Sequence, residues 1–317
     1  MRIVFLNAEN LFITPKDHPG KHQLEKDPQK CRQLANALFE IDAEFVWIIE
    51  VGGIESLQLF SKLYLDDRYQ ASLIPSNSDR GIDIGVLSKR GLPYRMELCT
   101  NKNYDLPFNY PYEIAANEMA AKVGQPLPFA SHKLSRDFSE LRLFHKGTKK
   151  PFLIMLCVHL KSQLDAKGID PRGFLRREAE VKLLKRVVKS LNKHFGEDVP
   201  VIFGGDFNGR ANGDSMDPEF LALKKLPHKE LADLLSLEHH DRITHVYFDK
   251  WDKKIEQQMD FCFVPPSLWK QVDHQNSGIY RWKAASDGPL PIPQSQFQRY
   301  GLPSDHYPVV LSLNLGV

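Results

Sequence analysis

The sequence predicts a layered α/β protein in which a single domain spans residues 1–317. Two observations predict this class: short apolar runs of strand length recur along the chain, and amphipathic helical patterns fall between several of them. The length of 317 residues allows one large domain or two ordinary ones, and a hydrophobic content of 42% suffices for a substantial core. We favour one domain because polar residues at positions 7 and 306 are both expected in the same site.

Seven segments have the composition of β-strands. Each is a short and nearly continuous apolar run, which is the pattern of a strand buried on both faces of its sheet. The runs occupy residues 2–7, 45–51, 84–88, 152–158, 200–204, 260–264 and 308–313.

Two segments have helical periodicity. In residues 28–41 and 173–195, apolar side chains recur every three or four positions, as on the buried face of a helix. Residues 101–140 and 275–303 contain four prolines each and are expected to be long loops. Because such loops usually carry function, both are candidate walls of a substrate site.

Charge and composition exclude several classes of protein. The formal net charge is +2, so charge alone does not predict tight nonspecific binding to nucleic acid. No apolar run reaches the ~18 residues that a transmembrane helix needs, and the first residues lack the features of a signal peptide. The four cysteines form no CxxC motif, and Cys157 and Cys262 stand inside apolar runs. Buried free thiols and a cytoplasmic location are therefore expected, with a mature secreted form as the alternative.

Acidic, amide and histidine side chains stand repeatedly at the edges of the strand-like runs. The first polar residue beyond a buried strand lies at the rim of its sheet, so strands that lie side by side would bring these residues together. Five runs carry such residues: Asn7 and Glu9, Glu50, His159, Asp206 and Asn208, and Asp305 and His306.

Two of these rims offer oxygen ligands. Glu50 directly follows a wholly apolar run, where a carboxylate is costly unless a cation, a base or water relieves it; an exposed loop glutamate is the alternative. Asp206 and Asn208 stand two residues apart after two glycines, so in an extended segment both side chains face one ligand. The competing interpretation is a glycine turn with local capping. It is less favoured because Asn7 and Glu9 form a second pair with the same spacing after another strand.

The histidines have candidate carboxylate partners. Asp305 and His306 are adjacent in an extended segment and should therefore face different partners. Asp260, at the start of an apolar run, is a candidate to fix the tautomer of a histidine. His159 is isolated in the sequence, and Asp83 is its candidate orienting acid; a structural histidine and a loop carboxylate are the alternatives.

The ligand types indicate hydrolysis of a phosphate ester. The candidate ligands are hard oxygens, and neither a cysteine cluster nor an HExxH motif occurs, which favours Mg²⁺ or Mn²⁺ over structural zinc. A metal would stabilise charge on the phosphoryl oxygen while a base activates water and an acid protonates the leaving oxygen. Arg172, near the start of the basic helical segment, is well placed for a phosphate, although most such basic faces are simply solvated.

Taken in chain order, the motifs resemble those of the endonuclease/exonuclease/phosphatase superfamily, which includes deoxyribonuclease I. The resemblance spans residues 3–313, and its most specific motifs are GDFN and SDHYPV. The matching segments are LNAENL at 6–11, the strand ending in Glu50, RGIDIGVLS at 80–88, VHLKS at 158–162, GGDFN at 204–208, MDF at 259–261 and SDHYPV at 304–309.

The resemblance implies a four-layered α/β sandwich, with two central β-sheets packed face to face and helices outside. It implies Glu50 as the main metal ligand, with Glu9, Asp206 and Asp305 as further ligands. Asn7, Asn208, Arg80 and Arg172 are expected around the phosphate, His306 pairs with Asp260, and His159 pairs with Asp83. Where the family usually has Gln before the metal-binding Glu, this chain has Ile49.

The first functional hypothesis is a Mg²⁺- or Mn²⁺-dependent phosphodiesterase that acts on nucleic acid. The alternative is a phosphatase or phosphodiesterase for a small or lipid phosphate ester, of the inositol phosphate or sphingomyelin type. A noncatalytic binding member of the superfamily is a third hypothesis, which the complete set of chemically competent residues disfavours. The choice among DNA, RNA and small esters, the number of metal ions and the oligomeric state stay open at this point.

Overall fold

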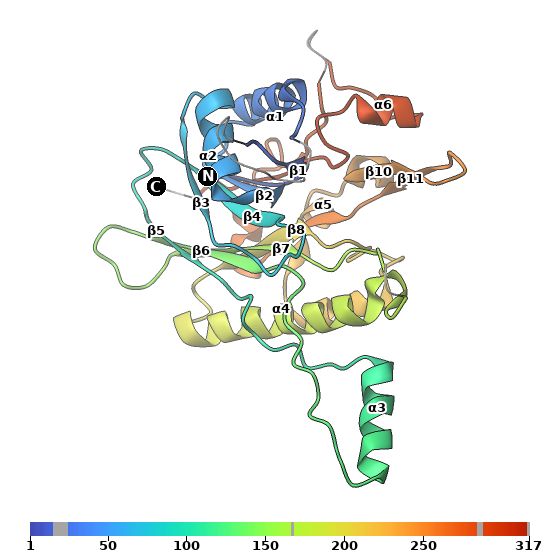
Figure 1. Ribbon diagram of the computed structural model, residues 1–317. Helices are drawn as coiled ribbons and strands as arrows, with labels where there is room; N and C mark the ends of the chain where they lie inside the picture. Colours follow the sequence, from blue (N-terminus) through green and yellow to red (C-terminus); the bar gives the residue numbers. More distant parts are fainter. Residues whose placement is uncertain (15–24, 166–167, 284–287, 316–317) are drawn as a thin grey trace.

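Two six-stranded mixed sheets form the centre of the protein (Figure 1). The computed structural model describes residues 1–14, 25–165, 168–283 and 288–315. The first sheet has the strand order β13-β14-β1-β2-β4-β3. Its strands are β1 (Arg2–Leu11), β2 (Phe45–Val51), β3 (Tyr69–Leu73), β4 (Asp83–Lys89), β13 (Gly278–Ile279) and β14 (Val309–Ser312).

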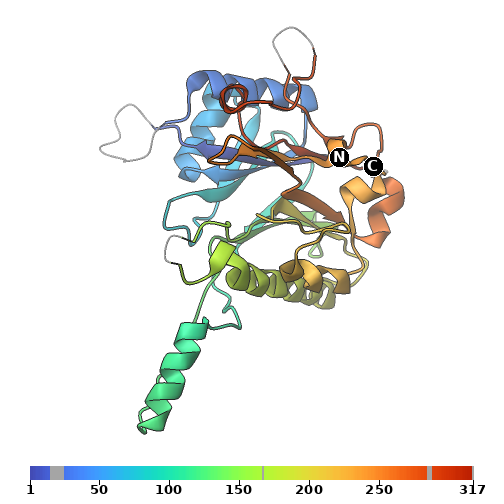
Figure 2. The same ribbon diagram turned by 90° about the vertical axis from the view of Figure 1, so that its right-hand side faces the viewer.

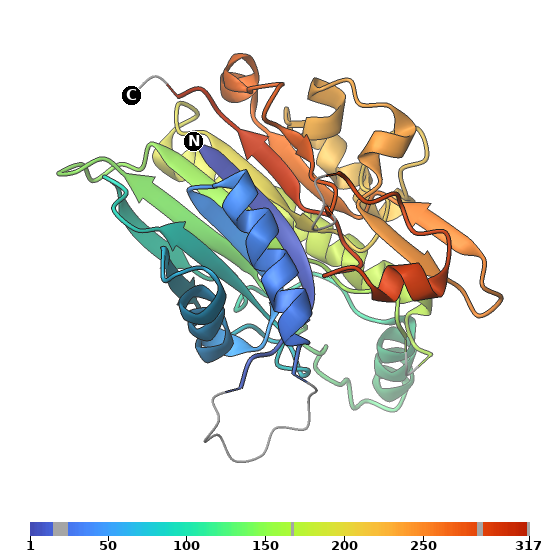
Figure 3. The same ribbon diagram turned by 90° about the horizontal axis from the view of Figure 1, so that it is seen from above.

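The second sheet has the order β5-β6-β7-β8-β12-β9, and a separate two-stranded hairpin lies beside the sandwich. The strands of this sheet are β5 (Arg95–Cys99), β6 (Phe138–Phe144), β7 (Leu153–His159), β8 (Val201–Asp206), β9 (Lys229–Glu230) and β12 (Asp260–Val264). The hairpin consists of β10 (His245–Phe248) and β11 (Lys254–Gln257). It lies next to the short helix α6 (Gln296–Tyr300) at one edge of the molecule (Figures 1 and 3).

The alternation of side chains along the strands produces four layers. Ile3 and Phe5 of β1 share one core with Met155 and Cys157 of β7, so the inner faces of the two sheets pack against each other. The intervening residues, such as Val4, point outward and pack beneath helices. The outer helices are α1 (Pro28–Ile41) and α2 (Gly53–Tyr64) on the first sheet and α4 (Phe174–Phe195) on the second (Figure 1).

This architecture confirms the α/β class and the four-layered sandwich that the resemblance implies. Each of the seven apolar runs forms a strand, and the two segments with helical periodicity form α1 and α4. The four cysteines are free, and Cys31, Cys157 and Cys262 are buried. Among the described helices, none combines the length and the apolar character that crossing a bilayer requires.

The two proline-rich segments are not loops throughout, so that prediction is wrong in part. Residues 101–140 contain α3 (Pro111–Lys122) and the start of β6, and residues 275–303 contain β13 and α6. Helix α3 projects away from the sandwich beyond α4 (Figure 2), and none of its residues is buried. Because α3 packs no apolar face on the core, its sequence lacks the periodic apolar residues from which a helix is predicted.

Gly205, in the strand that ends at Asp206, occupies a position that no larger residue fits. Its φ is +125°, and a Cβ there would lie 2.2 Å from the carbonyl oxygen of Val158 on the neighbouring strand. Glycine alone adopts this conformation readily and leaves room for the adjacent backbone. The local sequence therefore lets β8 lie close to β7 at the end where His159 and Asp206 stand in register.

Gly205→Ala is expected to destabilise the protein by about 3 kcal/mol or more, because backbone strain and a backbone clash add together. Gly91→Ala is the matched control, since Gly91 also has a positive φ of +82° but its added Cβ would meet nothing within 4 Å. Urea unfolding measures both variants. Equal destabilisation in the two would contradict a close approach of β7 and β8 at Gly205.

Candidate active site

Three candidate residues lie next to each other at one edge of the second sheet. His159 ends β7, Asp206 ends β8 and Asp260 begins β12. Strand pairing aligns them, because His159 is the register partner of Asp206 and Asp206 is the partner of Asp260. All three side chains are buried, so their charges interact with little screening by water.

The first sheet supplies Asn7, Glu50 and His306 at the corresponding edge. Asn7 is the register partner of Ile49, which places Glu50 one residue beyond the regular pairing of β1 with β2. The register then shifts, and Glu9 and Glu50 have φ values of 49° and 64°. Non-glycine residues rarely adopt this left-handed conformation, and such strain occurs often at functional sites.

Hydrogen bonds join the rims of the two sheets. Asn7 donates its side-chain amide to Asp206 Oδ2 over 2.9 Å, and His306 Nδ1 lies 2.7 Å from Asp260 Oδ2. Ser304 supports both contacts, since its hydroxyl donates to the Asn7 carbonyl over 2.8 Å and accepts from the His306 amide over 3.1 Å. The predicted pairing of His306 with Asp260 is therefore present.

The charge of Asp260 controls the protonation of His306. Burial lowers the pKa of an imidazole, but the nearby carboxylates, Asp260 first among them, raise the pKa of His306 well above its usual value. The ring is thus an imidazolium at neutral pH and can donate a proton from Nε2. Its Nδ1 is already held by Asp260.

His159 is in the opposite protonation state. Burial, and then the positive charge of Arg136, lower the pKa of His159 well below its usual value, so the ring is neutral at pH 7. Its Nε2 lies 3.8 Å from Glu50 Oε1 and 3.8 Å from Asp206 Oδ2. The ring therefore stands between the carboxylates contributed by the two sheets.

The predicted pairing of His159 with Asp83 is wrong. Asp83 begins β4 in the first sheet, and its carboxylate accepts a hydrogen bond of 2.7 Å from the Ser76 amide. The Nδ1 atom of His159 has no hydrogen-bond partner in the described part of the chain. Asp83 instead holds the loop that precedes its own strand, because its side chain turns back toward residue 76.

Glu50 has the surroundings of a cation ligand. Burial, and then the charge of Asp206, raise the pKa of Glu50. Within the described residues its carboxylate accepts one hydrogen bond, 3.2 Å from the Asn10 amide. Asp206 accepts hydrogen bonds from the Asn7 side chain and the Asn208 amide. The two carboxylates offer hard oxygen atoms, which suit Mg²⁺ or Mn²⁺.

The other two predicted metal ligands have protein cations as partners. Arg299 Nη2 lies 2.8 Å from Asp305 Oδ2 and 3.5 Å from Glu9 Oε1. His245 Nε2 lies 3.5 Å from Asp305 Oδ2. Burial would raise the pKa of Asp305, but the hydrogen bond from His245 and the surrounding positive charges hold it below its usual range.

The predicted phosphate ligands lie at increasing distance from this centre. The backbone amide of Asn208 donates to Asp206 Oδ1 over 2.8 Å. Arg80 Nη2 donates to Asn10 Oδ1 over 3.0 Å, and its charge lowers the pKa of Glu50. Arg172 is exposed and reaches the site through Gln163, which accepts from Arg172 over 3.0 Å and donates to the Asn208 carbonyl over 3.2 Å.

Comparisons with known proteins give a result for structure and none for sequence. No protein-family model and no curated protein matches the sequence. Among solved structures, TDP2 from D. rerio, complexed with single strand DNA product, superposes with a TM-score of 0.61 at 17% identity, covering 99% of each chain. A mannosyl-6-phosphatase from Bacteroides thetaiotaomicron has a TM-score of 0.55 at 15% identity, covering 99% of each chain.

An endonuclease/exonuclease/phosphatase family protein from Bacteroides thetaiotaomicron also matches, with a TM-score of 0.55 and 15% identity. It covers 98% of this chain and 96% of its own. This chain has the endonuclease/exonuclease/phosphatase fold. The similarity establishes the fold that the motifs predicted.

Two arginines and a histidine near the rim of this endonuclease/exonuclease/phosphatase fold escaped the sequence analysis. The ring of His245 lies 4.5 Å from that of His306, centroid to centroid, and Arg299 contacts Asp305. Arg136 is buried, and its Nη1 donates to the Leu160 carbonyl over 3.1 Å. No local signal marks them, because they stand in a short hairpin, a short helix and the end of a loop.

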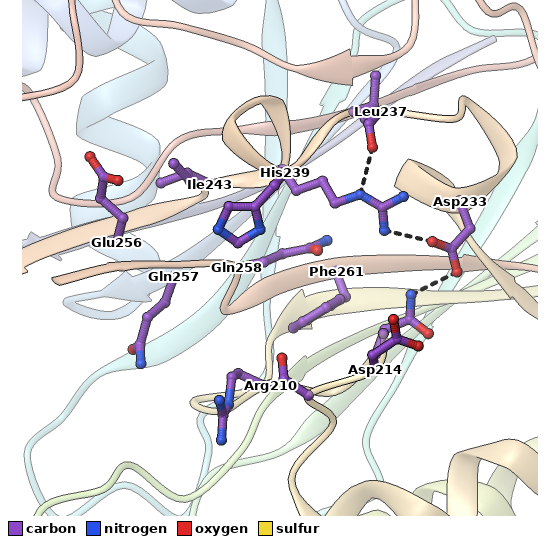
Figure 4. Close-up of a pocket in the computed structure, with 14 residues that line it drawn as sticks. Arg210, Asp214, Asp233, Leu237, His239, Ile243, Glu256, Gln257, Gln258 and Phe261 are labelled. Atoms are coloured by element: carbon purple, nitrogen blue, oxygen red, sulfur yellow. Dashed lines mark hydrogen bonds and ion pairs between the residues drawn. The ribbon is translucent and has the colours of Figure 1, made fainter.

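A cavity of about 700 Å³ lies among residues that include Arg210, Asp233 and His239 (Figure 4). Its wall includes Gln257, Gln258 and Phe261, which flank Asp260 in the sequence, and the facing loop contributes Arg210. The Oε1 atom of Gln257 is buried and has no hydrogen-bond partner among the described residues. The volume is that of a small-molecule site.

Asp260→Asn is expected to lower the pKa of His306, because the substitution removes the carboxylate that stabilises the imidazolium. Below about pH 6.5 the raised pKa contributes its full stability, which is lost as the pH rises through the folded-state pKa. Histidine NMR titration of both proteins measures the change. Asp83→Asn is the control and should leave the His306 titration unchanged; an equal change in both variants would contradict the assignment.

Proposed function

We propose that this chain is a metal-dependent phosphoesterase that hydrolyses phosphodiester bonds, with nucleic acid as its substrate. One observation carries the proposal. Two histidines with pKa values displaced in opposite directions, His306 upward and His159 downward, stand at one rim with Glu50 and Asp206. Titratable groups whose environments separate their pKa values are the usual basis of acid and base roles in one site.

Mg²⁺ or Mn²⁺ is the proposed cofactor. Glu50 and Asp206 would hold the ion, because both are largely buried carboxylates and the charge of Asp206 raises the pKa of Glu50. The Asn7 amide, bonded to Asp206 Oδ2, would orient that carboxylate. When bound, such an ion supplies positive charge that stabilises the phosphoryl oxygens.

Side chains of the protein would supply the proton transfers and bind the phosphate. His306, as an imidazolium fixed by Asp260, would donate Nε2–H to an oxygen of the phosphate. Asp206 would accept the proton of the attacking water, and the leaving oxygen would take the Nε2 proton of His306 as its bond to phosphorus breaks. Asn208, next to Asp206, and Arg80, at the mouth of the site, would bind phosphate oxygens.

Nucleic acid is the first substrate class for two reasons. The D. rerio TDP2 structure that resembles this chain contains single strand DNA product. In this chain, Arg80 and Arg172 lie at the outer rim, where the neighbouring phosphates of a strand would pass. A small phosphate ester is the second candidate, which the similarity to a mannosyl-6-phosphatase favours.

Hydrolysis of single-stranded DNA, RNA and a sugar phosphate by the purified chain tests both candidates. With Mg²⁺ or Mn²⁺, we expect cleavage of at least one nucleic acid and a loss of about 100-fold or more in Glu50→Gln, Asp206→Asn and His306→Gln. The reason is that each variant removes a charge or a proton donor from the rim. Product analysis by gel electrophoresis and phosphate release measure the rates.

Asp273→Asn is the matched control, since this exposed carboxylate bonds only to its own loop in the described structure and should keep the full rate. Full activity in EDTA would contradict the role of the metal. Cleavage of the sugar phosphate alone would replace the first substrate class with the second.

A further inference from the structure

His245 lies directly against His306 and comes from the hairpin, outside the two six-stranded sheets. A β-bridge pairs the two residues, and an antiparallel pair in register carries its side chains on one face. The centroids of the two imidazole rings are 4.5 Å apart, with 43° between the ring planes. The His245 side chain is 12% exposed. The ring of His245 is therefore packed onto the ring of His306.

Backbone contacts hold the hairpin in this position. The Tyr307 amide donates to the Thr244 carbonyl over 2.7 Å. The Thr244 hydroxyl accepts from the Asp260 amide over 2.9 Å, which ties the hairpin to the strand that carries the partner of His306. Thr244 and Val246 are fully buried. His245 stands between these two residues, so its backbone position is fixed.

The polar contacts of His245 are weak, so ring packing is its principal interaction. Nε2 lies 3.5 Å from Asp305 Oδ2, at the outer limit of hydrogen bonding. Nδ1 is buried and has no hydrogen-bond partner among the described residues. The second ring contact of His245 is with Tyr247, two residues along the same strand, at 5.6 Å between centroids. His245 is thus the middle ring of a row of three that begins at His306.

His306 needs a contact on its ring face, because one hydrogen bond does not fix an imidazole. The bond between Nδ1 and Asp260 Oδ2 holds one edge of the ring. The second side-chain torsion of histidine has broad minima, so this bond alone leaves the ring free to tilt. A second ring packed on the face restricts the tilt, and with it the direction of Nε2.

We propose that His245 is a positioning residue: its ring, packed on His306, directs Nε2 of His306 toward the leaving oxygen. His245 acts through His306 and does not itself touch the substrate. The inference rests on the proposed function, because that function gives Nε2 of His306 its role. The effect depends on the ring of His245 and not on its nitrogen atoms.

The nitrogen atoms of His245 offer a competing role, which determines the choice of variants. His245, Asp305 and His306 place ligand atoms within 4.8 Å of one another, as in a metal site. His245→Phe keeps a ring of similar size and can neither bind an ion nor bond to Asp305. His245→Asn keeps a polar side chain without the ring, and His245→Ala removes both. His240→Ala is the control, since the His240 side chain in the same part of the chain is 76% exposed.

The mobility of the His306 ring tests the proposal without substrate or metal. The measurement is NMR relaxation of ¹³C-labelled histidine side chains in the full chain, with the His306 signals assigned from their loss in His306→Gln. We expect exchange broadening of the His306 signals in His245→Ala and His245→Asn, because the ring can then tilt. His245→Phe and His240→Ala should give signals as sharp as those of the wild type. Sharp His306 signals in His245→Asn, or equal broadening in His245→Phe and His245→Ala, would overturn the proposal.

Steady-state hydrolysis of single-stranded DNA measures the consequence for the proposed reaction. A misdirected group costs up to about 100-fold in rate, so kcat should fall by about 10- to 100-fold in His245→Ala and His245→Asn. KM should change by less than about threefold, and His245→Phe should keep kcat within about threefold of the wild type. A loss in His245→Phe as large as that in His245→Ala would assign the role to the nitrogen atoms and contradict the proposal. If the wild type hydrolyses no phosphodiester, the proposed function fails, and the NMR comparison still decides whether His245 holds the His306 ring.

Discussion

The alignment of two sheets across their shared core is the constraint on which the candidate site depends. Asn7 and His306 come from the first sheet, Asp206 and Asp260 from the second, and two hydrogen bonds of 2.9 and 2.7 Å connect them. The inner side chains fix this alignment, because a shift of one residue in a strand would turn its apolar set to the other face. The packing of the core therefore determines which polar groups meet at the rim.

Burial strengthens the electrostatic interactions that set the protonation states of the histidines at the rim. In a site shielded from water, a neighbouring carboxylate raises the pKa of a histidine and a neighbouring guanidinium lowers it. The result is an imidazolium at His306 and a neutral ring at His159, although both residues end or adjoin buried strands. The charge of Asp206 raises the pKa of Glu50, while Arg299 forms an ion pair with Asp305.

Residues that follow apolar strands could be predicted from sequence, and residues brought in by loops could not. Glu50 and Asp206 stand directly after runs whose composition alone defines the strand end. The partner of His159 was misjudged because a sequence does not show which way a side chain such as Asp83 turns. Arg299 stands in a helix of five residues with no buried side chain, so no periodicity marks it.

A double-mutant cycle across the two sheets tests the central claim that His306 and Asp260 act as one unit in metal-dependent phosphoester hydrolysis. The measurement is kcat/KM for the wild type, Asp260→Asn, His306→Gln and the double variant. Residues that act as a unit lose activity non-additively, so the double variant should be no slower than the slower single variant. Losses that multiply in the double variant would show that the two residues act independently and would contradict the account.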